Sequence, residues 1–267
     1  MNWIKKRYNK RSAKKHGWHP SWFAPFLSEF NEELLDEIVK FQVEHDLKPD
    51  GLVGSMTFRR LLTSREALDT EEKENYILIN GERVYVDWDV KIDLIKPGAF
   101  SKQKKTRKPN MIVTHWDVYT FCIDNDGVVY QYLDTNDIGW HAGGVNKYSI
   151  GVDLSNAYYT KYNSIYKKRG FKERPILSNS YVHGRKLKPH LGYYAVQIEA
   201  YKRLISTLCK HHDISLSVPE KNNQLITGVH KAAAKGKFDG VVCHYHLTRK
   251  KIDCAGLELK KIVDSLC

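Results

Sequence analysis

The pattern of apolar and polar positions predicts short buried strands that alternate with amphipathic helices. Apolar runs at residues 111–115, 150–154 and 241–243 have the length and composition of buried strands. Residues 193–211 carry apolar side chains at alternating steps of four and three, which predicts a helix with one buried face. Residues 257–266 predict a terminal helix. This alternation indicates an α/β domain in which helices flank a mixed central sheet.

The residues that precede this domain predict a small, all-helical module. Asn31 can cap a helix in which Leu34, Ile38 and Phe41 lie on one face. The Asp-Gly pair at residues 50–51 is typical of a turn, and a second helix follows it. We expect the first helix of the module to come from residues 20–30.

The first 19 residues hold seven Lys or Arg and no acidic side chain. We expect them to form a solvated, flexible leader. The alternative is a cationic arm that touches an anionic envelope polymer or lipid.

A β-hairpin is predicted at residues 76–88, because β-rich runs flank the dipeptide Asn80–Gly81. It could be an edge ribbon of the larger domain or a spacer between domains. We expect three parts: residues 1–66 (leader and helical module), 67–108 (linker with the hairpin) and 109–267 (the larger domain).

The formal charge of +12 points to an anionic partner, and nucleic acid, an anionic membrane and a bacterial cell wall all qualify. No nucleic-acid-binding motif accompanies the charge, so we expect no nucleic acid partner. Five scattered cysteines favour a reducing compartment over a disulfide framework. No apolar run has the length of a signal peptide or a transmembrane segment. We therefore expect a monomer that is made in the cytoplasm and has no stable membrane insertion.

Five motifs stand out in the larger domain: VTH (113–115), IDNDGVVYQ (123–131), GWHAGGVNKYSIGVDL (139–154), VVCH (241–244) and KIDCAG (251–256). Together they resemble the zinc-dependent N-acetylmuramoyl-L-alanine amidases, the family of the type 2 amidases and the peptidoglycan recognition proteins. This resemblance runs from about residue 110 to the C-terminus. The pattern FQxxxxLxxDGxxGxxTxxxL at residues 41–61 is similar to the helical peptidoglycan-binding repeat of wall hydrolases.

The resemblance implies a Zn²⁺ ion with three protein ligands and one open position. His115 and His244 match the two histidines that follow strands, and Cys254 matches the third ligand. Two alternatives stay open for the third ligand. His246 lies eight residues before Cys254, and Asp253 is its neighbour in the chain.

The resemblance also implies roles for further residues. Asp153 stands at the position of the general base, and Lys251 at that of a lysine that stabilises the oxyanion. Tyr119 is a candidate catalytic tyrosine, with a core aromatic as an equal alternative. The remaining candidates, which we expect to contact substrate, are Trp140, His141 and Asn146.

The expected function is hydrolysis of peptidoglycan at the amide bond between N-acetylmuramic acid and L-alanine. The two-part layout resembles a phage endolysin, made in the host cytoplasm and acting on the cell wall. The alternatives are a zinc endopeptidase acting on the stem peptide and a non-catalytic peptidoglycan receptor. A Tyr- and Lys-rich insertion at about residues 157–190 shows no helical or strand period, and we expect it to rim the substrate groove.

Overall fold

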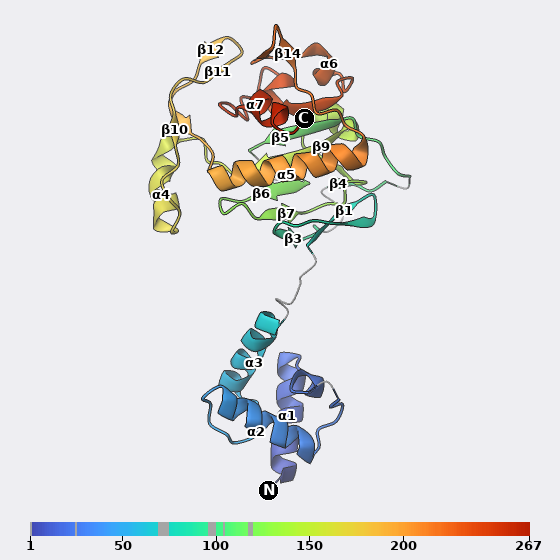
Figure 1. Cartoon of the computed structure of the whole chain (residues 1–267), viewed down its shortest axis with the longest axis vertical. Helices are drawn as coiled ribbons and strands as arrows, with labels where there is room; N and C mark the ends of the chain where they lie inside the picture. The colour runs from blue at the N-terminus through green and yellow to red at the C-terminus, as the bar shows by residue number, and fades with distance from the viewer. Residues whose placement is uncertain (1, 25, 69–74, 96–99, 104, 117–119) are drawn as a thin grey trace. The chain divides into compact units, whose positions relative to one another are not determined.

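The computed structural model describes residues 2–24, 26–68, 75–95, 100–103, 105–116 and 120–267. The chain divides into two units, Met1–Lys73 and Glu74–Cys267. Figure 1 shows the elements of each unit. Among the described helices, none has the length and apolar character needed to cross a membrane.

In its described residues, the first unit has three α-helices and one short 3-10 helix. The bounds are α1 Asn2–His16, η1 Pro20–Trp22, α2 Glu32–Glu44 and α3 Ser55–Leu68. The cap predicted for α2 is confirmed, because the side chain of Asn31 accepts the backbone N–H of Leu34 at 2.9 Å. A small apolar core, which includes Trp18, Leu34 and Ile38, holds the helices together.

The prediction of a flexible leader was wrong, because residues 2–16 form α1. Asn9 is buried and binds the turn after α2 twice, donating to the carbonyl of Gly51 and accepting the N–H of Val53, both at 2.9 Å. The hydroxyl of Ser12 donates to the Val53 carbonyl at 2.6 Å. The first helix of the unit is therefore α1, and residues 20–30 contribute only the turn η1. Because α1 docks through polar side chains, it lacks the apolar stripe that reveals a packed helix.

The predicted hairpin is present as β1 Tyr76–Ile79 and β2 Glu82–Tyr85, and it belongs to the second unit. The buried side chain of Gln131 pairs with both the N–H and the carbonyl of Leu78 at 2.7 Å. The next strand, β3 (Val90–Ile92), pairs with β7 at the edge of the main sheet. Residues 76–92 are thus part of the larger unit rather than of a linker, and the hairpin packs against the sheet.

The main sheet has six strands in the order β16-β5-β9-β6-β7-β3. The remaining bounds are β16 Gly240–Cys243, β5 Met111–His115, β9 Ser149–Leu154, β6 Phe121–Ile123 and β7 Val129–Gln131. β16, β5, β9 and β6 run parallel, and β7 is antiparallel to β6. The predicted mixed sheet flanked by helices is confirmed. The carboxyl ends of the parallel strands meet at one edge, where sites form in such sheets.

The two faces of the sheet have different cover. Helix α5 (Ala195–His212) lies across one face (Figure 1), and its Tyr201 hydroxyl lies 2.6 Å from the hydroxyl of Thr114 on β5. On the opposite face, Met111 and Val113 pack against Ala233 of α6 (Lys231–Ala234) and Val145 of η2 (Gly143–Tyr148). α7 (Leu259–Asp264) joins the core on the α5 side. Both helices predicted in the C-terminal half are therefore present.

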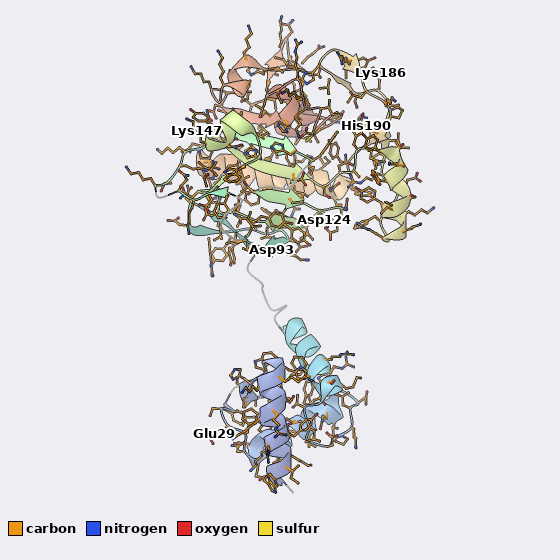
Figure 2. The ribbon with its side chains drawn as sticks, turned by 180° about the vertical axis from the view of Figure 1, so that it is seen from behind. Glu29, Asp93, Asp124, Lys147, Lys186 and His190 are labelled. Carbon is orange, nitrogen blue, oxygen red and sulfur yellow. The ribbon has the colours of Figure 1, made fainter. Side chains whose placement is uncertain are left out.

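The insertion after β9 contains short helices and strands, although its sequence shows no helical or strand period. It contains η3 Thr160–Tyr162, α4 Asn163–Lys168, β10 Ile176–Leu177, β11 Tyr181–Val182, β12 Arg185–Lys186 and β13 His190–Leu191. Figure 2 shows Lys186 and His190 on the side of the unit that carries α4, away from Lys147. Buried Arg174 ties the insertion down, because it donates to the Ser155 and Gly192 carbonyls at 2.7 and 2.8 Å.

Two further strand pairs and one 3-10 helix complete the unit. β4 (Phe100–Ser101) pairs with β8 (Ile138–Gly139), and β14 (Glu220–Lys221) pairs with β15 (Gln224–Leu225). The 3-10 helix η4 (His244–His246) follows β16 directly, so it begins at the sheet edge where the parallel strands end.

Candidate metal centre

Two strand ends and one loop bring three ionisable side chains together. His115 is the last residue of β5, and His244 follows the last residue of β16. Side chains alternate between the faces of a strand. Cys243 lies in register with Thr114 and belongs to the core under α5, so His244 and His115 project from the opposite face. Asp253, in the loop after η4, extends its carboxylate toward the rings of His115 and His244.

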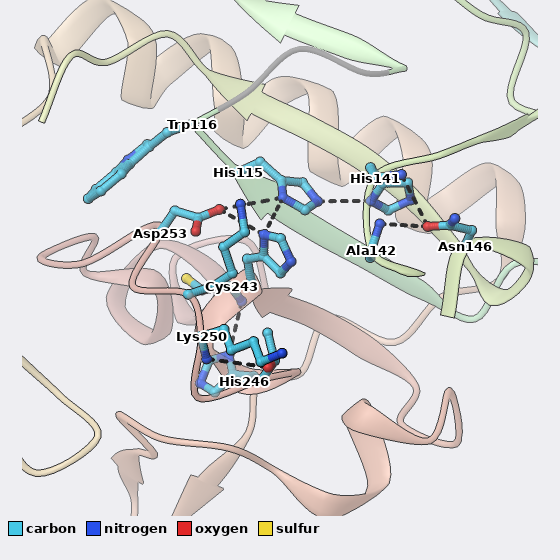
Figure 3. A network of polar contacts seen from close by, with 12 residues as sticks. His115, Trp116, His141, Ala142, Asn146, Cys243, His246, Lys250 and Asp253 are labelled. Carbon is cyan, nitrogen blue, oxygen red and sulfur yellow. Dashed lines mark hydrogen bonds and ion pairs between the residues drawn. The ribbon is translucent and has the colours of Figure 1, made fainter. Parts of the chain in front are cut away.

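The facing atoms of these side chains form a compact triangle. Figure 3 shows Asp253 beside His115. Nδ1 of His115 lies 3.0 Å from Nδ1 of His244 and 3.5 Å from Oδ2 of Asp253. Nδ1 of His244 lies 3.0 Å from the same carboxylate oxygen. All three residues are buried.

Burial and mutual contact set the charge states of the group. Burial is the main cause that lowers the pKa of His115 to about 4, although the nearby Asp253 carboxylate acts in the opposite direction. For Asp253, burial favours the neutral acid, but the contacts with His115 and His244 outweigh it and hold the pKa of this carboxyl below its usual range. At neutral pH the group therefore contains an ionised carboxylate beside a neutral His115 ring.

These residues fit a zinc ion. Ligand atoms that share a tetrahedral Zn²⁺ at about 2.0 to 2.2 Å lie roughly 3.3 to 3.6 Å apart. The spacings of 3.0 to 3.5 Å between the three atoms are close to that range. Imidazole nitrogen and carboxylate oxygen are also donors that zinc accepts, and three protein ligands leave one position for water or substrate.

The expected third ligand, Cys254, is not part of this group. It is fully buried in the apolar core under α5, where its thiol contacts Cys243. Burial raises the pKa of this thiol well above its usual value, which disfavours the thiolate that zinc binds. Asp253, an alternative from the sequence, takes the position next to the two histidines.

The other alternative, His246, has both ring nitrogens engaged elsewhere. Its Nδ1 accepts the backbone N–H of Cys243 at 2.9 Å, and its Nε2 lies 2.6 Å from the carbonyl oxygen of Ile226. Burial lowers the pKa of His246 to about 4, so the ring is neutral and Nε2 donates its hydrogen. His246 therefore holds the chain around β16 and does not face the group.

Two residues expected to contact substrate instead make hydrogen bonds within the protein. His141 is buried, and its Nδ1 lies 2.8 Å from Nε2 of His115. Burial holds the pKa of His141 well below its usual value, and the nearby His115 and Arg107 add to this effect. The side-chain oxygen of Asn146 accepts the backbone N–H groups of His141 and Ala142 at 3.1 and 2.5 Å. Asn146 thus shapes the loop that carries His141.

Trp140 differs from these two residues because 56% of its surface is exposed. Its indole N–H donates to the hydroxyl of Ser101 at 3.0 Å, which fixes the ring at the surface beside the His141 loop. A fixed and exposed aromatic ring is available for contact with a sugar or a peptide.

The expected catalytic residues lie near the group where the structure describes them. Asp153 on β9 is in register with His115, so their side chains leave the same face of the sheet. It is buried, and the thiol of Cys122 donates to its Oδ2 at 3.2 Å. The charge of Lys251 lies close enough to contribute to the lowered pKa of His115. Tyr119 lies outside the described residues.

One residue that positions this region was missed in the sequence. Arg107 is buried and donates to three backbone carbonyls, those of Thr135 (2.6 Å), Asn146 (3.1 Å) and Ser149 (3.0 Å). Burial lowers its pKa to about 10, so it remains charged at neutral pH. The sequence places Arg107 in a run of basic residues and offers no signal that separates it from its solvated neighbours.

A His-His-carboxylate group at the carboxyl edge of a parallel sheet is an arrangement found in metal-dependent hydrolases. The family comparison is specific: residues 96–253 match the N-acetylmuramoyl-L-alanine amidase family Amidase_2. The match spans more than half of the chain, which therefore belongs to this family. The family predicted from the sequence motifs is confirmed. A comparison with curated protein sequences found no match.

Solved structures of an amidase, an endolysin and a hydrolase resemble the chain at low sequence identity. N-acetylmuramoyl-L-alanine amidase LysC from Clostridium intestinale URNW is 16% identical, with 66% of this chain and 97% of that chain covered and a TM-score of 0.38. A mutant endolysin from Bacillus subtilis is 19% identical, with 67% and 99% covered and a TM-score of 0.37. The Staphylococcus aureus hydrolase AmiA is 8% identical, with 67% and 82% covered and a TM-score of 0.39.

Proposed function

We propose that the protein is a zinc-dependent amidase that cleaves peptidoglycan between the lactyl group of N-acetylmuramic acid and L-alanine. The observation that carries the proposal is the buried triangle of His115, His244 and Asp253, whose donor types and spacings suit Zn²⁺. The family match supports the amide bond as the target. A complete set of three donors also favours an enzyme over a non-catalytic receptor.

Zn²⁺ in this site would supply Lewis-acid activation of water and of the scissile carbonyl. The residues around it would transfer the protons and stabilise the developing negative charge. Asp153 takes the proton of the attacking water and returns it to the leaving amine. The ammonium group of Lys251 faces the negative charge that develops on the carbonyl oxygen. Trp140 offers its exposed ring to the glycan or the peptide, and Tyr119 remains a candidate for the same reaction.

The test is product analysis on isolated sacculi, with zinc content measured on the same protein sample. We expect one zinc ion per chain and products that carry new L-alanine N-termini and intact lactyl groups on muramic acid. A chelator should stop the formation of these products, and added Zn²⁺ should restore it. New amino groups elsewhere in the stem peptide would indicate an endopeptidase. Tight binding to sacculi without any release would indicate a receptor.

We propose further that the first unit binds the wall and holds the enzyme on its insoluble substrate. It has a surface cleft of about 410 Å³ beside the turn after α2. The cleft is lined by Tyr8, Gln42, Asp46, Leu47, Lys48, Asp50, Leu52, Gly54, Ser55, Met56 and Thr57. Buried Gln42 holds this turn, since its Oε1 accepts the Gly51 N–H at 2.8 Å and its Nε2 donates to Asp50 at 3.0 Å. A turn held by hydrogen bonds beside a cleft with both apolar and polar lining residues suits recognition of a glycopeptide.

This second proposal is tested with the full chain in chelator, so that binding is measured without lysis. Tyr8→Ala, at the rim of the cleft, should weaken sedimentation with sacculi several-fold. Phe26→Ala is the control, because Phe26 is also an exposed aromatic residue of the same unit but does not line the cleft. Equal binding by both variants would place the wall-binding surface elsewhere.

We propose that the enzyme serves as an endolysin and works as a monomer. Its net charge of +12 suits adsorption to an anionic wall. The protein expressed inside a bacterium with a matching wall should cause lysis only after the membrane is permeabilised. Lysis without permeabilisation would contradict this role, and sedimentation equilibrium tests the monomer.

A further inference from the structure

A chain of side-chain contacts continues behind His115, on the side away from His244 and Asp253. Nε2 of His115 lies 2.8 Å from Nδ1 of His141, and Nε2 of His141 lies 3.2 Å from the hydroxyl oxygen of Ser149. The Ser149 hydroxyl also donates to the carbonyl oxygen of Val145 at 2.9 Å. His115, His141 and Ser149 are each at most 5% exposed. Figure 3 shows His115 between Asp253 on one side and His141 on the other.

The end of this chain dictates where each hydrogen lies. A serine hydroxyl has one hydrogen, and here it points to the Val145 carbonyl, which can only accept. Toward His141 the Ser149 oxygen must therefore accept, so Nε2 of His141 carries its ring hydrogen. A neutral imidazole has one N–H, which leaves Nδ1 of His141 as an acceptor. Nε2 of His115 then carries the hydrogen in the bond between the two rings.

We propose that His141 is a positioning residue that fixes the tautomer and the orientation of the metal ligand His115. With its hydrogen on Nε2, the His115 ring directs the lone pair of Nδ1 toward His244 and Asp253. The inference rests on the proposed metal site. Partners behind a ligating histidine orient the ring in this way and typically contribute about 10- to 100-fold to metal affinity.

The surroundings of His141 suit this role better than contact with substrate. Both of its ring nitrogens are used inside the protein. Its backbone N–H is held by the side chain of Asn146, and Arg107 binds the carbonyls of Asn146 and Ser149. These hydrogen bonds hold both the backbone at His141 and the backbone at Ser149 in place. A ring held so firmly can serve as a fixed acceptor for His115.

The first test reads the tautomers directly in the metal-free, full-length protein. Long-range proton–nitrogen NMR spectra of the histidine rings distinguish hydrogen on Nδ1 from hydrogen on Nε2. We expect the Nε2–H form for both His115 and His141 at neutral pH. The Nδ1–H form for His141 would overturn the inference without any substitution that could unfold the protein.

The second test measures Zn²⁺ affinity by competition with a chromophoric chelator. His141→Phe keeps the ring volume but removes the acceptor, so Zn²⁺ affinity should fall about 10- to 100-fold. His141→Asn can place its amide oxygen near the position of Nδ1 and should restore most of the loss. Ser149→Ala frees the His141 tautomer and should show a smaller loss in the same direction.

The outcomes separate this inference from the proposed function. If the wild-type protein binds no zinc, the metal site itself fails. If the wild-type protein and His141→Phe bind zinc equally well, only the positioning role fails. In that case a raised KM on sacculi for His141→Phe would return His141 to substrate contact. A loss of affinity that His141→Asn does not rescue would also overturn the role, because it would reflect packing alone.

Discussion

Oδ2 of Asp253 lies 3.0 Å from Nδ1 of His244, whereas the next residue in the chain, Cys254, packs in the core under α5. This relationship predicts opposite results for two adjacent substitutions. Asp253→Ala removes a ligand. It should lower Zn²⁺ affinity by more than about 100-fold, the upper end of the loss that follows removal of a ligand's hydrogen-bond partner. Cys254→Ala should keep the zinc, since its thiol contacts Cys243 instead. Zinc content after dialysis checks both, and the reverse result would restore the thiolate as the ligand.

Substitution of the proposed general base should separate metal binding from turnover. Asp153→Asn keeps the shape of the side chain but removes the proton acceptor, so turnover on sacculi should fall about 10²- to 10⁴-fold. Zinc content should not change, because Asp153 is outside the group of three donors. Asp126→Asn, at an exposed carboxylate in a turn, is the control and should have full activity. An unchanged rate for Asp153→Asn would assign the base to another residue.

Arg107 should be important for stability although it is remote in sequence from the residues it holds. Arg107→Met would leave the carbonyls of Thr135, Asn146 and Ser149 without their donors and should cost about 3 kcal/mol. Urea unfolding of the second unit measures this change. The control Lys108→Met alters an exposed neighbour and should change the free energy of unfolding by less than about 0.5 kcal/mol. Equal stability of the two variants would contradict the structural role.

Stability should fall at mildly acidic pH, and His212 should account for part of the fall. Burial lowers the pKa of His212 to about 4, with Arg107 and His211 acting in the same direction and Asp134 and Asp213 against it. Its neutral ring lies 3.0 Å from the Thr135 hydroxyl. Between pH 6.5 and 4 the unfolded chain therefore binds a proton that the folded chain does not, so stability decreases as the pH falls. Above about pH 6.5 the contribution of the neutral His212 to the free energy of unfolding is fully present.

The measurement is urea unfolding in chelator at pH 7.5 and pH 5. His212→Gln should reduce the loss of stability between these values by about 1 to 2 kcal/mol, a figure that allows for the partial exposure of the ring. Other buried histidines contribute equally to both proteins and cancel in the comparison. Lys210→Gln, at an exposed neighbour in the same helix, should leave the pH dependence as it is. An identical slope for wild type and His212→Gln would show that His212 does not contribute.

Helix α1 should be part of the folded first unit in solution. Asn9→Ala removes both bonds to the turn at Gly51 and Val53 and should destabilise the unit by about 2 kcal/mol. Hydrogen exchange of α1 amides in the full chain reports this directly. Lys10→Ala, at the exposed next position, should leave the protection unchanged. Rapid exchange throughout α1 in the wild-type protein would favour a flexible leader instead.

Local patterns were sufficient for most of the fold. The strands that end near His115 and at Cys243 are continuous apolar runs, and α5 has a clear helical period, so each element follows from its own residues. Helix α1 does not follow from its own residues in this way, because Asn9 and Ser12 hold it to a backbone turn 41 to 44 residues away. Polar side chains that bind distant backbone leave no periodic signal in the sequence.

By itself, the sequence determined the family, the alternating strands and helices, and the two histidines of the proposed metal site, because these depend on residue order and local period. Only the tertiary structure places Asp253, and not its neighbour Cys254, beside the two histidines. It also decided that His141 contacts His115 and that Arg107 holds the loop around it. Those relationships depend on which segments meet at one edge of the sheet and on which face each side chain projects from, and residue spacing does not encode either.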